Sequence, residues 1–302
     1  MTRPADVALV TEPRFRNAAS ATAAGVAAWY LGNILAEDRL VTAGFARHGL
    51  TCERLVWSDP DIDWASYRCA VFRTPWDYYR RFDELTAWLD RAEQLTRFFN
   101  PPALVRWNMD KHYLADLEAR GVHTVPTRFV ERGSRTRLVE AAGEWSEVVI
   151  KPAVSGAAQN THRLDLAADH EALFAELVAS RAMLVQPLQR AILEAGETTL
   201  VAFDGRYSHA VLKRAKPGDF RVQDDHGGTV HAYRPSDEEI AFCEAAMRSC
   251  EPTPAYGRAD MIRDNDGRLA IMELELFEPE LWLREHAPSG QALADAVVRR
   301  LG

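Results

Sequence analysis

Short apolar runs alternate with helical patterns over roughly the first 105 residues of the chain. The apolar runs cover residues 6–11, 52–57, 68–73 and 97–100, and residues 33–48 and 81–94 have the periodicity of amphipathic helices. Strands that alternate with helices predict a parallel sheet. We therefore expect residues 1–105 to form an open α/β lobe, with its loops gathered at the carboxyl ends of the strands.

The pattern changes after residue 105, where the predicted strands outnumber the helices and hairpins dominate. Strands are predicted at 124–130, 147–152, 183–187, 197–203 and 206–213, and helices at 108–120, 236–250 and 289–301. We expect an α+β arrangement with antiparallel sheets in this part, divided into residues 106–190 and 191–302. The absence of a flexible linker predicts that these parts pack closely against the first lobe.

The composition is that of a globular protein, and it restricts the partners. Of the 302 residues, 47% are hydrophobic and 26% are charged, and the formal net charge is −8. An acidic chain is a poor partner for nucleic acid or an anionic membrane, so an anionic ligand would need local clusters of lysine and arginine. The cysteines form no C-x-x-C pair, and the chain has neither a signal-peptide pattern nor a run of about 18 apolar residues. We therefore expect a cytoplasmic protein that binds neither nucleic acid nor a membrane.

Acidic side chains near the C-terminal end are predicted to share one face of a sheet. Alternate side chains of a strand point the same way, so Glu273 and Glu275 share a face. If residues 258–262 pair antiparallel with this strand across an Asn-Asp-Gly turn, Asp260 joins them. Carboxylates placed together repel one another unless a cation lies between them, and oxygen ligands of this kind suit Mg²⁺. The alternative is a solvated, acidic sheet face.

Basic residues elsewhere are candidate phosphate contacts. Lys151 ends a predicted strand before a polar loop that contains Ser155 and Gly156, and Lys111 lies in the predicted helix 108–120. Neither lysine belongs to a Walker A loop, and no dinucleotide fingerprint follows the first strand. Taken singly, each lysine is typical of a surface residue whose head group stays in water.

A third basic cluster surrounds a Pro-Gly turn. Residues 212–221 contain Lys213 and Arg221 together with two further cations. This segment is either a clamp on phosphates, with Arg221 bidentate to a transferring phosphoryl group, or a solvated basic loop.

The segment Gln186-Pro187-Leu188 ends a buried strand. Proline fixes φ and removes one donor, which leaves backbone groups that are able to bind the edge of an adenine. An ordinary strand terminus is the alternative.

A polar and aromatic segment, residues 71–79, leaves the end of a strand in the first lobe. Arg73, Asp77 and Tyr78 are candidates to hold the carboxylate and the amine of a small amino acid. The alternative is a helix entry at Pro75.

These residues, taken in order, resemble the ATP-grasp superfamily with its glutathione-synthetase-like ATP-binding fold. The matching residues are Lys111, Lys151, Gln186, Pro187, Glu197, Lys213, Arg221, Asp260, Glu273 and Glu275. Residues 208–223 with Gly227-Gly228, 76–78 and 276–279 are similar to bacterial members of the O-ureido-serine cyclo-ligase type, which make cycloserine. The likeness extends over residues 68–285. It implies an N-terminal pre-ATP-grasp α/β lobe, and a nucleotide bound between two antiparallel-sheet lobes formed by residues 106–190 and 191–302.

The resemblance also implies a role for each matching residue. ATP would be bound by Lys111, Lys151, Ser155, Gly156, Gln186, Pro187, Leu188 and Glu197, together with Lys213 and Arg221. Asp260, Glu273 and Glu275 would hold one or two Mg²⁺ ions, although many relatives have Asn at the position of Glu275. Lys213 and Arg221 would be catalytic, with Arg221 on the γ-phosphate and on the later oxyanion. The substrate would lie near Arg73, Asp77, Tyr78 and Glu280.

The implied activity is that of an ATP- and Mg²⁺-dependent carboxylate–amine ligase. It would act through an acylphosphate on a small amino-acid-like substrate, and the likeness to the cyclo-ligases suggests a ring closure within one molecule. The alternatives are an amide ligase that joins two molecules and a nucleotide-binding regulatory module without turnover. The resemblance also suggests a homodimer.

Overall fold

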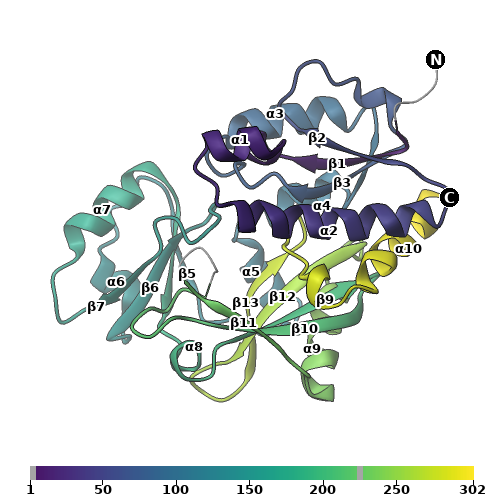
Figure 1. Ribbon diagram of the computed structural model, residues 1–302. Coiled ribbons are helices and arrows are strands. Elements are labelled where there is room, and N and C mark those ends of the chain that lie inside the picture. The colour runs from purple at the N-terminus through teal and green to yellow at the C-terminus, as the bar shows by residue number, and fades with distance from the viewer. Residues whose placement is uncertain (1–4, 223–226) are drawn as a thin grey trace.

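The computed structural model describes residues 5–222 and 227–302 and arranges them around three sheets (Figure 1). Gln223, which belongs to the segment that resembles the cyclo-ligases, lies outside the described residues.

The first sheet is parallel and four-stranded, in the order β2-β1-β3-β4. Its strands are β1 (Val7–Thr11), β2 (Cys52–Val56), β3 (Cys69–Thr74) and β4 (Arg97–Phe99). The helices of this part are α1 (Ala18–Ala23), α2 (Ala28–Ala46), α3 (Phe82–Ala92) and α4 (Pro102–Asn108), with 3₁₀ turns at Pro13–Phe15 and Trp64–Ser66. Every residue of β1 and β3 is buried, as expected for parallel strands covered on both faces. The predicted parallel sheet is confirmed.

The C-terminal helix packs along α2 of the first lobe (Figure 1). This helix, α10, spans Ser289–Leu301. A Cβ atom on Gly290 would lie 2.6 Å from the carbonyl oxygen of Leu40, and one on Gly44 would lie 2.5 Å from that of Gly290. Only glycine permits so close an approach of two helix backbones. The first lobe and the C-terminal helix are therefore held together through this helix pair. Helix α2 begins at Ala28, earlier than the predicted start at residue 33.

The second sheet is antiparallel and four-stranded, in the order β5-β8-β6-β7. Its strands are β5 (Arg128–Val130), β6 (Glu147–Pro152), β7 (His162–Asp165) and β8 (Met183–Pro187). Helices α6 (Leu138–Ala142) and α7 (Glu171–Ser180) share a hydrophobic cluster with this sheet. Strand β7 and these two helices were not predicted, and β5 is shorter than the strand predicted at 124–130.

The third sheet is five-stranded, in the order β11-β10-β9-β12-β13, and all its strand pairs are antiparallel. Its strands are β9 (Glu197–Phe203), β10 (Arg206–Arg214), β11 (Thr229–Ala232), β12 (Tyr256–Arg263) and β13 (Leu269–Glu275). The remaining helices are α5 (Tyr113–Ala119), α8 (Arg190–Glu194) and α9 (Asp237–Arg248), with a 3₁₀ turn at Leu283–Glu285. The predicted antiparallel sheets and the hairpin of β9 and β10 are confirmed.

Strand β13 lies at the edge of the third sheet, and side chains bind its free edge. The backbone N–H of Leu276 donates to Oδ1 of Asn108 at 2.7 Å, and Nδ2 of Asn108 donates to the carbonyl of Leu274 at 2.6 Å. The N–H of Leu274 donates to the hydroxyl of Tyr113 at 2.9 Å. Because these contacts replace a neighbouring strand, the strand that carries Glu273 and Glu275 is held in place on both sides.

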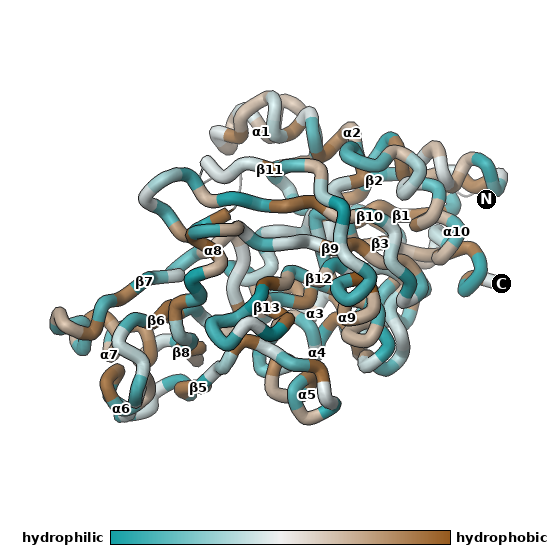
Figure 2. The backbone as a smooth tube through the Cα atoms, turned by 90° about the horizontal axis from the view of Figure 1, so that it is seen from below, coloured by the Kyte–Doolittle hydropathy of each residue, from teal (hydrophilic) through white to brown (hydrophobic). Residues whose placement is uncertain are grey.

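The long helices α2 and α10 carry both polar and apolar residues (Figure 2). Across the part of the chain that the structure describes, no helix combines the length and the apolar character needed to cross a membrane.

Candidate active site

A cavity of about 1010 Å³ lies where the three sheets meet. It is lined from β6 and β8 of the second sheet, from β9, β10, β12 and β13 of the third sheet, and from the segment around α1 and α2. Its volume is at the upper end of the range that small-molecule sites occupy. All the predicted site residues except Arg73 and Asp77 are among its lining residues.

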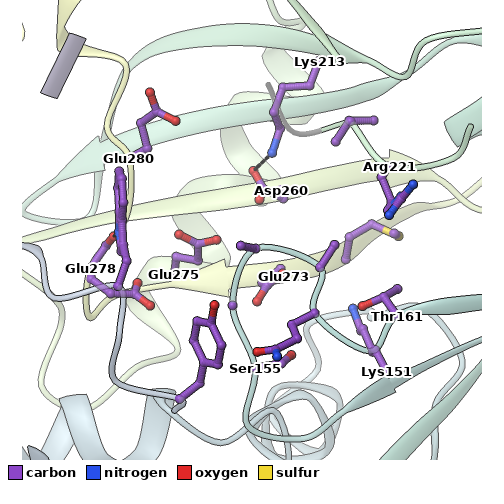
Figure 3. A pocket seen from close by; sticks show the side chains of 18 of the residues that line it. Lys151, Ser155, Thr161, Lys213, Arg221, Asp260, Glu273, Glu275, Glu278 and Glu280 are labelled. Atoms are coloured by element: carbon purple, nitrogen blue, oxygen red, sulfur yellow. Dashed lines mark hydrogen bonds and ion pairs between the residues drawn. The ribbon is translucent and has the colours of Figure 1, made fainter. Parts of the chain in front are cut away.

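The acidic face predicted for β12 and β13 is present. Asp260 lies directly opposite Glu273 in the antiparallel ladder, and Arg258 lies opposite Glu275. Leu274 is buried on the other face, as the alternation predicts. The side chains of Asp260, Glu273 and Glu275 enter the same pocket (Figure 3).

Cationic side chains lie between these carboxylates. Arg258 donates from Nε to one oxygen of Asp260 at 3.1 Å and from Nη2 to the other at 2.8 Å, and Nη2 also contacts Glu275. Nζ of Lys213 lies 3.1 Å from Asp260 and 2.5 Å from Glu197 (Figure 3). Asp260 also accepts a hydrogen bond of 2.6 Å from Thr199. The acidic face is thus neutralised by the protein's own cations.

The donor set fits a hard divalent cation in its chemistry, since carboxylate oxygens are the ligands that Mg²⁺ prefers. Among the described residues, however, no three carboxylate, imidazole or thiol groups are grouped so as to hold an ion. Both oxygens of Asp260 are already engaged by Arg258. Metal binding at this face therefore requires the arginine and Lys213 to give up part of their contacts.

Burial and neighbouring charges shift the pKa values of the three carboxyl groups in different directions. Burial raises the pKa of Asp260, but Arg258 and Lys213 lower it more, so the net shift is downward. Burial likewise raises the pKa of Glu273, and Lys111 with Lys151 turns the net shift downward. The pKa of Glu275 is well above its ordinary value because burial outweighs the attraction of Arg258. The surroundings therefore favour the ionised form of Asp260 and Glu273 more than that of Glu275.

The two lysines predicted to contact phosphate line the same cavity. Nζ of Lys111 donates to the carbonyl of Ser155 at 2.9 Å and lies 3.2 Å from Oε1 of Glu273. The ammonium group of Lys151 has no hydrogen bond or ion pair within residues 5–222 and 227–302, and burial lowers its pKa. Gly156 follows in the loop, where a Cβ atom would lie 2.9 Å from the ring of Tyr79. The loop backbone thus comes close to an aromatic side chain of the first lobe.

Lys111 does not lie in a helix, which corrects the prediction of one helix at 108–120. Helix α4 ends at Asn108 and α5 begins at Tyr113. Oδ1 of Asp110 accepts from the N–H of His112 at 3.0 Å, and the N–H of Lys111 donates to the carbonyl of Ala153 at 2.9 Å. These bonds compete with helical hydrogen bonds and break the helix.

The segment Gln186-Pro187-Leu188 lines the cavity, but its backbone groups are not free in the way the sequence suggested. The N–H of Leu188 donates to the carbonyl of Glu147 at 3.0 Å, and its carbonyl accepts from Asn265 at 2.9 Å. The side chain of Gln186 donates to Thr127 at 2.8 Å. The polar groups of this segment are therefore largely used within the fold.

Arg221 lines the cavity from the loop after β10. It forms a bidentate pair with Asp219, at 3.0 Å from Nε and 2.8 Å from Nη2. The bidentate contact that was predicted between Arg221 and a phosphoryl group is thus made, in this structure, with the carboxylate of Asp219 in the same loop.

Arg73 and Asp77 lie outside the cavity lining, which corrects the expectation that they hold the substrate. Arg73 is 2% exposed and binds Asp38 at 3.0 Å and Glu37 at 3.2 Å, both on α2. Asp77 accepts from the indole of Trp57 at 2.8 Å and from Arg81 at 2.9 Å. Charged groups in these buried places need internal partners. Both side chains have such partners, although Nη1 of Arg73 has none among the described residues. Both residues therefore stabilise the first lobe.

The other predicted substrate residues line the cavity. The hydroxyl of Tyr78 donates to the carbonyl of Ser155 at 3.1 Å. Glu280 pairs with Arg284 at 2.6 Å, and Arg284 also binds Glu37 at 2.8 Å.

Sequence reasoning missed several lining residues, notably Arg258, Trp76 and Glu278. Arg258 lies two residues before Asp260, so the strand alternation already indicated that they share a face. Glu278 follows β13 in a loop, and burial with the nearby Glu273 raises its pKa to about 7. The segment from Arg14 to Tyr30, which had no predicted role, also contributes to the lining. The direction of a side chain in a loop cannot be predicted from the sequence, because loops lack the regular alternation of strands and helices.

Comparison with known proteins gives consistent matches. A family model described as the N-terminal domain of D-cycloserine synthetase DcsG matches residues 7–100. The cycloserine biosynthesis protein DcsG of Streptomyces lavendulae is 34% identical over 275 residues, which cover 84% of this chain and 90% of the relative. A glutathione synthetase of Prochlorococcus marinus (strain MIT 9313) is 31% identical over 205 residues, or 67% of this chain and 63% of that protein.

Solved structures agree with these relatives. The crystal structure of D-cycloserine synthetase DcsG has a TM-score of 0.82 at 30% identity and covers 98% of this chain and 99% of that chain. The ATP-grasp ligase PsnB, in complex with a precursor peptide and AMPPNP, has a TM-score of 0.61 at 18% identity, covering 98% of this chain and 97% of that one. The second likeness concerns the fold alone. With the sheets, the acidic face and the lysines described above, these matches show that the chain belongs to the DcsG family of ATP-grasp ligases.

Proposed function

We propose that this protein is an ATP- and Mg²⁺-dependent carboxylate–amine ligase that acts on a small amino-acid-like substrate. The observation that carries the proposal is the meeting of Lys111, Lys151 and Lys213 with the acidic face of β12 and β13 in one cavity. Lysines bind phosphate oxygens, and carboxylates bind the metal ion that phosphates share. Related ATP-grasp structures hold AMPPNP, or ADP with Mg, which supports the same cofactors here.

The reaction has two steps. A carboxylate oxygen of the substrate attacks the γ-phosphorus of ATP, and ADP leaves with the electron pair of the broken P–O bond, giving an acylphosphate. A nitrogen then attacks the acyl carbon, phosphate leaves with its bonding electrons, and the nitrogen loses a proton as the C–N bond forms. This chemistry depends more on positioning and charge stabilisation than on a strong base.

The residues take distinct parts in these steps. Lys111 and Lys151 bind phosphate oxygens, and Ser155 and Gly156 belong to the loop that covers them. Gln186, Pro187 and Leu188 frame the adenine by shape more than by free backbone groups. Arg221 exchanges Asp219 for the γ-phosphoryl group, and Lys213, held by Glu197, lies beside it. Asp260, Glu273 and Glu275 would hold Mg²⁺, which neutralises charge on the phosphates when bound.

The narrower proposal is that the nucleophilic nitrogen belongs to the same molecule, so that ligation closes a ring. Support comes from the relatives named as cycloserine biosynthesis and D-cycloserine synthetase proteins. The matched glutathione synthetase favours a second candidate, in which two molecules are joined. An enclosed site serves either reaction, because it keeps water from hydrolysing the acylphosphate.

A phosphate-release assay distinguishes the candidates. The purified protein is incubated with Mg²⁺-ATP and single amino-acid-like compounds, O-ureidoserine among them, and then with pairs of compounds. Phosphate release with one compound alone supports ring closure, and a strict requirement for a second amine supports intermolecular ligation. Nucleotide binding without phosphate release in any combination contradicts both and supports a regulatory module. Whether the protein forms a homodimer stays a prediction, which light scattering measures.

A further inference from the structure

Glu278 differs from the other carboxylates of the cavity. Each of those has a cationic partner: Glu197 and Asp260 bind Lys213, Glu273 binds Lys111, Glu275 binds Arg258, and Glu280 binds Arg284. Within the described part of the chain, Glu278 has no ion-pair partner, although it lines the same cavity. Its side chain is only partly exposed to water. An unpaired charge in such a partly buried place costs free energy. A cation supplied by a ligand would remove this cost.

Glu278 also lies at the end of the cavity away from Lys151 and Arg221, whereas Lys111 is near enough for its charge to lower the pKa of Glu278. In Figure 3, Glu273 and Glu275 separate Glu278 from Lys151 and Arg221. A substrate whose carboxylate meets the γ-phosphoryl group near the metal face would extend toward this end. The group adjacent to that carboxylate would then come within reach of Glu278.

Aromatic rings line this end and hold Glu278 by its backbone. Nε1 of Trp76 donates to the carbonyl oxygen of Glu278 at 2.9 Å. The ring of Trp76 packs tilted against Tyr30 at 6.1 Å, and both residues line the cavity. The ring of Phe15 is buried beneath Trp76, which packs edge-on at 5.5 Å, and the guanidinium of Arg14 lies 5.1 Å from its centroid. A carboxylate combined with aromatic faces is the set of groups that recognises an organic ammonium ion.

We propose that Glu278, with Trp76 and Tyr30, forms the subsite for the ammonium group that neighbours the activated carboxylate. The substrate class is then narrowed to free α-amino acids, and carboxylates that lack the α-ammonium group are rejected. This inference rests on the proposed ligase function and assigns a role to the segment around α1 and α2.

The first test uses the wild-type protein with two probes. O-ureidoserine carries the α-amino group, and 3-(ureidooxy)propionic acid is the same molecule without it. The second probe has no ammonium group, so Glu278 stays without a cationic partner when this probe binds. We expect this loss to lower kcat/KM for phosphate release by at least about 30-fold relative to O-ureidoserine. Equal turnover of both probes overturns the Glu278 subsite and leaves the ligase function standing. Phosphate release with neither probe, nor with any other amino acid, overturns the ligase proposal and this inference with it.

The second test replaces the carboxylate. Glu278→Gln should raise KM for O-ureidoserine and remove the discrimination between the probes, whereas Glu278→Asp, which keeps the charge, should retain much of it. The matched control is Glu144→Gln, an exposed carboxylate paired with Arg128, which should behave as wild type. Mg²⁺-dependent ATP binding, measured by calorimetry, should be unchanged in Glu278→Gln. Two results would overturn the subsite. Weakened Mg²⁺-dependent ATP binding in Glu278→Gln would make Glu278 a metal ligand. An active Glu278→Gln protein that keeps the full wild-type preference for O-ureidoserine over the second probe would show that Glu278 does not bind the ammonium group. If that variant fails to fold, the comparison of the two probes in the wild type decides.

Discussion

The ammonium nitrogen of Lys111 lies 3.2 Å from a carboxylate oxygen of Glu273, which is far along the chain. A lysine proposed to bind phosphate and a carboxylate proposed to bind metal are therefore partners of each other. When Mg²⁺ and ATP bind, each must exchange the other for a new ligand of opposite charge. The two binding events are thereby linked, and ATP should bind more weakly when Mg²⁺ is withheld.

Glu273→Gln should lower kcat for phosphate release by at least about 100-fold, because the metal face needs a charge that the amide lacks. The shape of the side chain is kept, so circular dichroism and thermal unfolding should show an intact fold. Glu144→Gln is the control for a general effect of removing one negative charge. A rate close to that of wild type would exclude Glu273 as a metal ligand.

Arg221→Lys should lower kcat by about 100-fold while changing KM for ATP little, because lysine cannot form a bidentate contact to the phosphoryl group. Steady-state kinetics over a range of ATP concentrations separates the two constants. Arg214→Lys, at an exposed position of the same segment, should leave both unchanged. A change in KM alone would contradict the role of Arg221 in the transition state.

Arg73→Met should destabilise the fold without changing KM for the amino-acid substrate. The substitution leaves Glu37 and Asp38 buried with one cation fewer, which lowers the free energy of unfolding by about 3 kcal/mol. Urea unfolding measures this loss. Arg263→Met, which breaks the exposed pair with Glu238, should cost less than about 1 kcal/mol. A raised KM in a fully stable Arg73→Met protein would restore the idea that Arg73 contacts substrate.

His209 should make the fold sensitive to acid. Burial lowers the pKa of its imidazole to about 4, and Nε2 donates to the carbonyl of Leu281 at 2.8 Å. The unfolded chain, with a pKa near 6.5, binds more protons than the folded protein between these values. Stability is therefore fully present above about pH 6.5 and falls, by about 3 kcal/mol, as the pH drops to about 4.

The contribution of His209 is measured from urea unfolding between pH 4.5 and 7.5. His209→Gln should have a shallower dependence of the unfolding free energy on pH than wild type. His231→Gln, at an exposed histidine, should keep the wild-type dependence. Parallel curves for His209→Gln and wild type would show that His209 is not the titrating group.

The sequence pattern was sufficient to predict which side chains share a face when the residues lie on one strand or on one pair of neighbouring strands. Glu273, Glu275 and Asp260 share a face because side chains alternate along a strand and because a tight turn leads into the partner strand. The helix at Lys111 was mispredicted because the carbonyl of Ala153, from another part of the chain, takes its backbone N–H. Arg73 was misassigned because its partners Glu37 and Asp38 lie on a different element.

The amino-acid sequence by itself determined most of the strands, the parallel and antiparallel halves and the acidic face. These features depend on periodicity and on neighbouring residues, which are visible in one dimension. Only the tertiary structure decided which charges pair, such as Lys111 with Glu273 and Arg258 with Glu275, and which have no ion pair among residues 5–222 and 227–302, such as Glu278. Electrostatic partners are set by distance in space, and that distance exists only once the sheets have packed together.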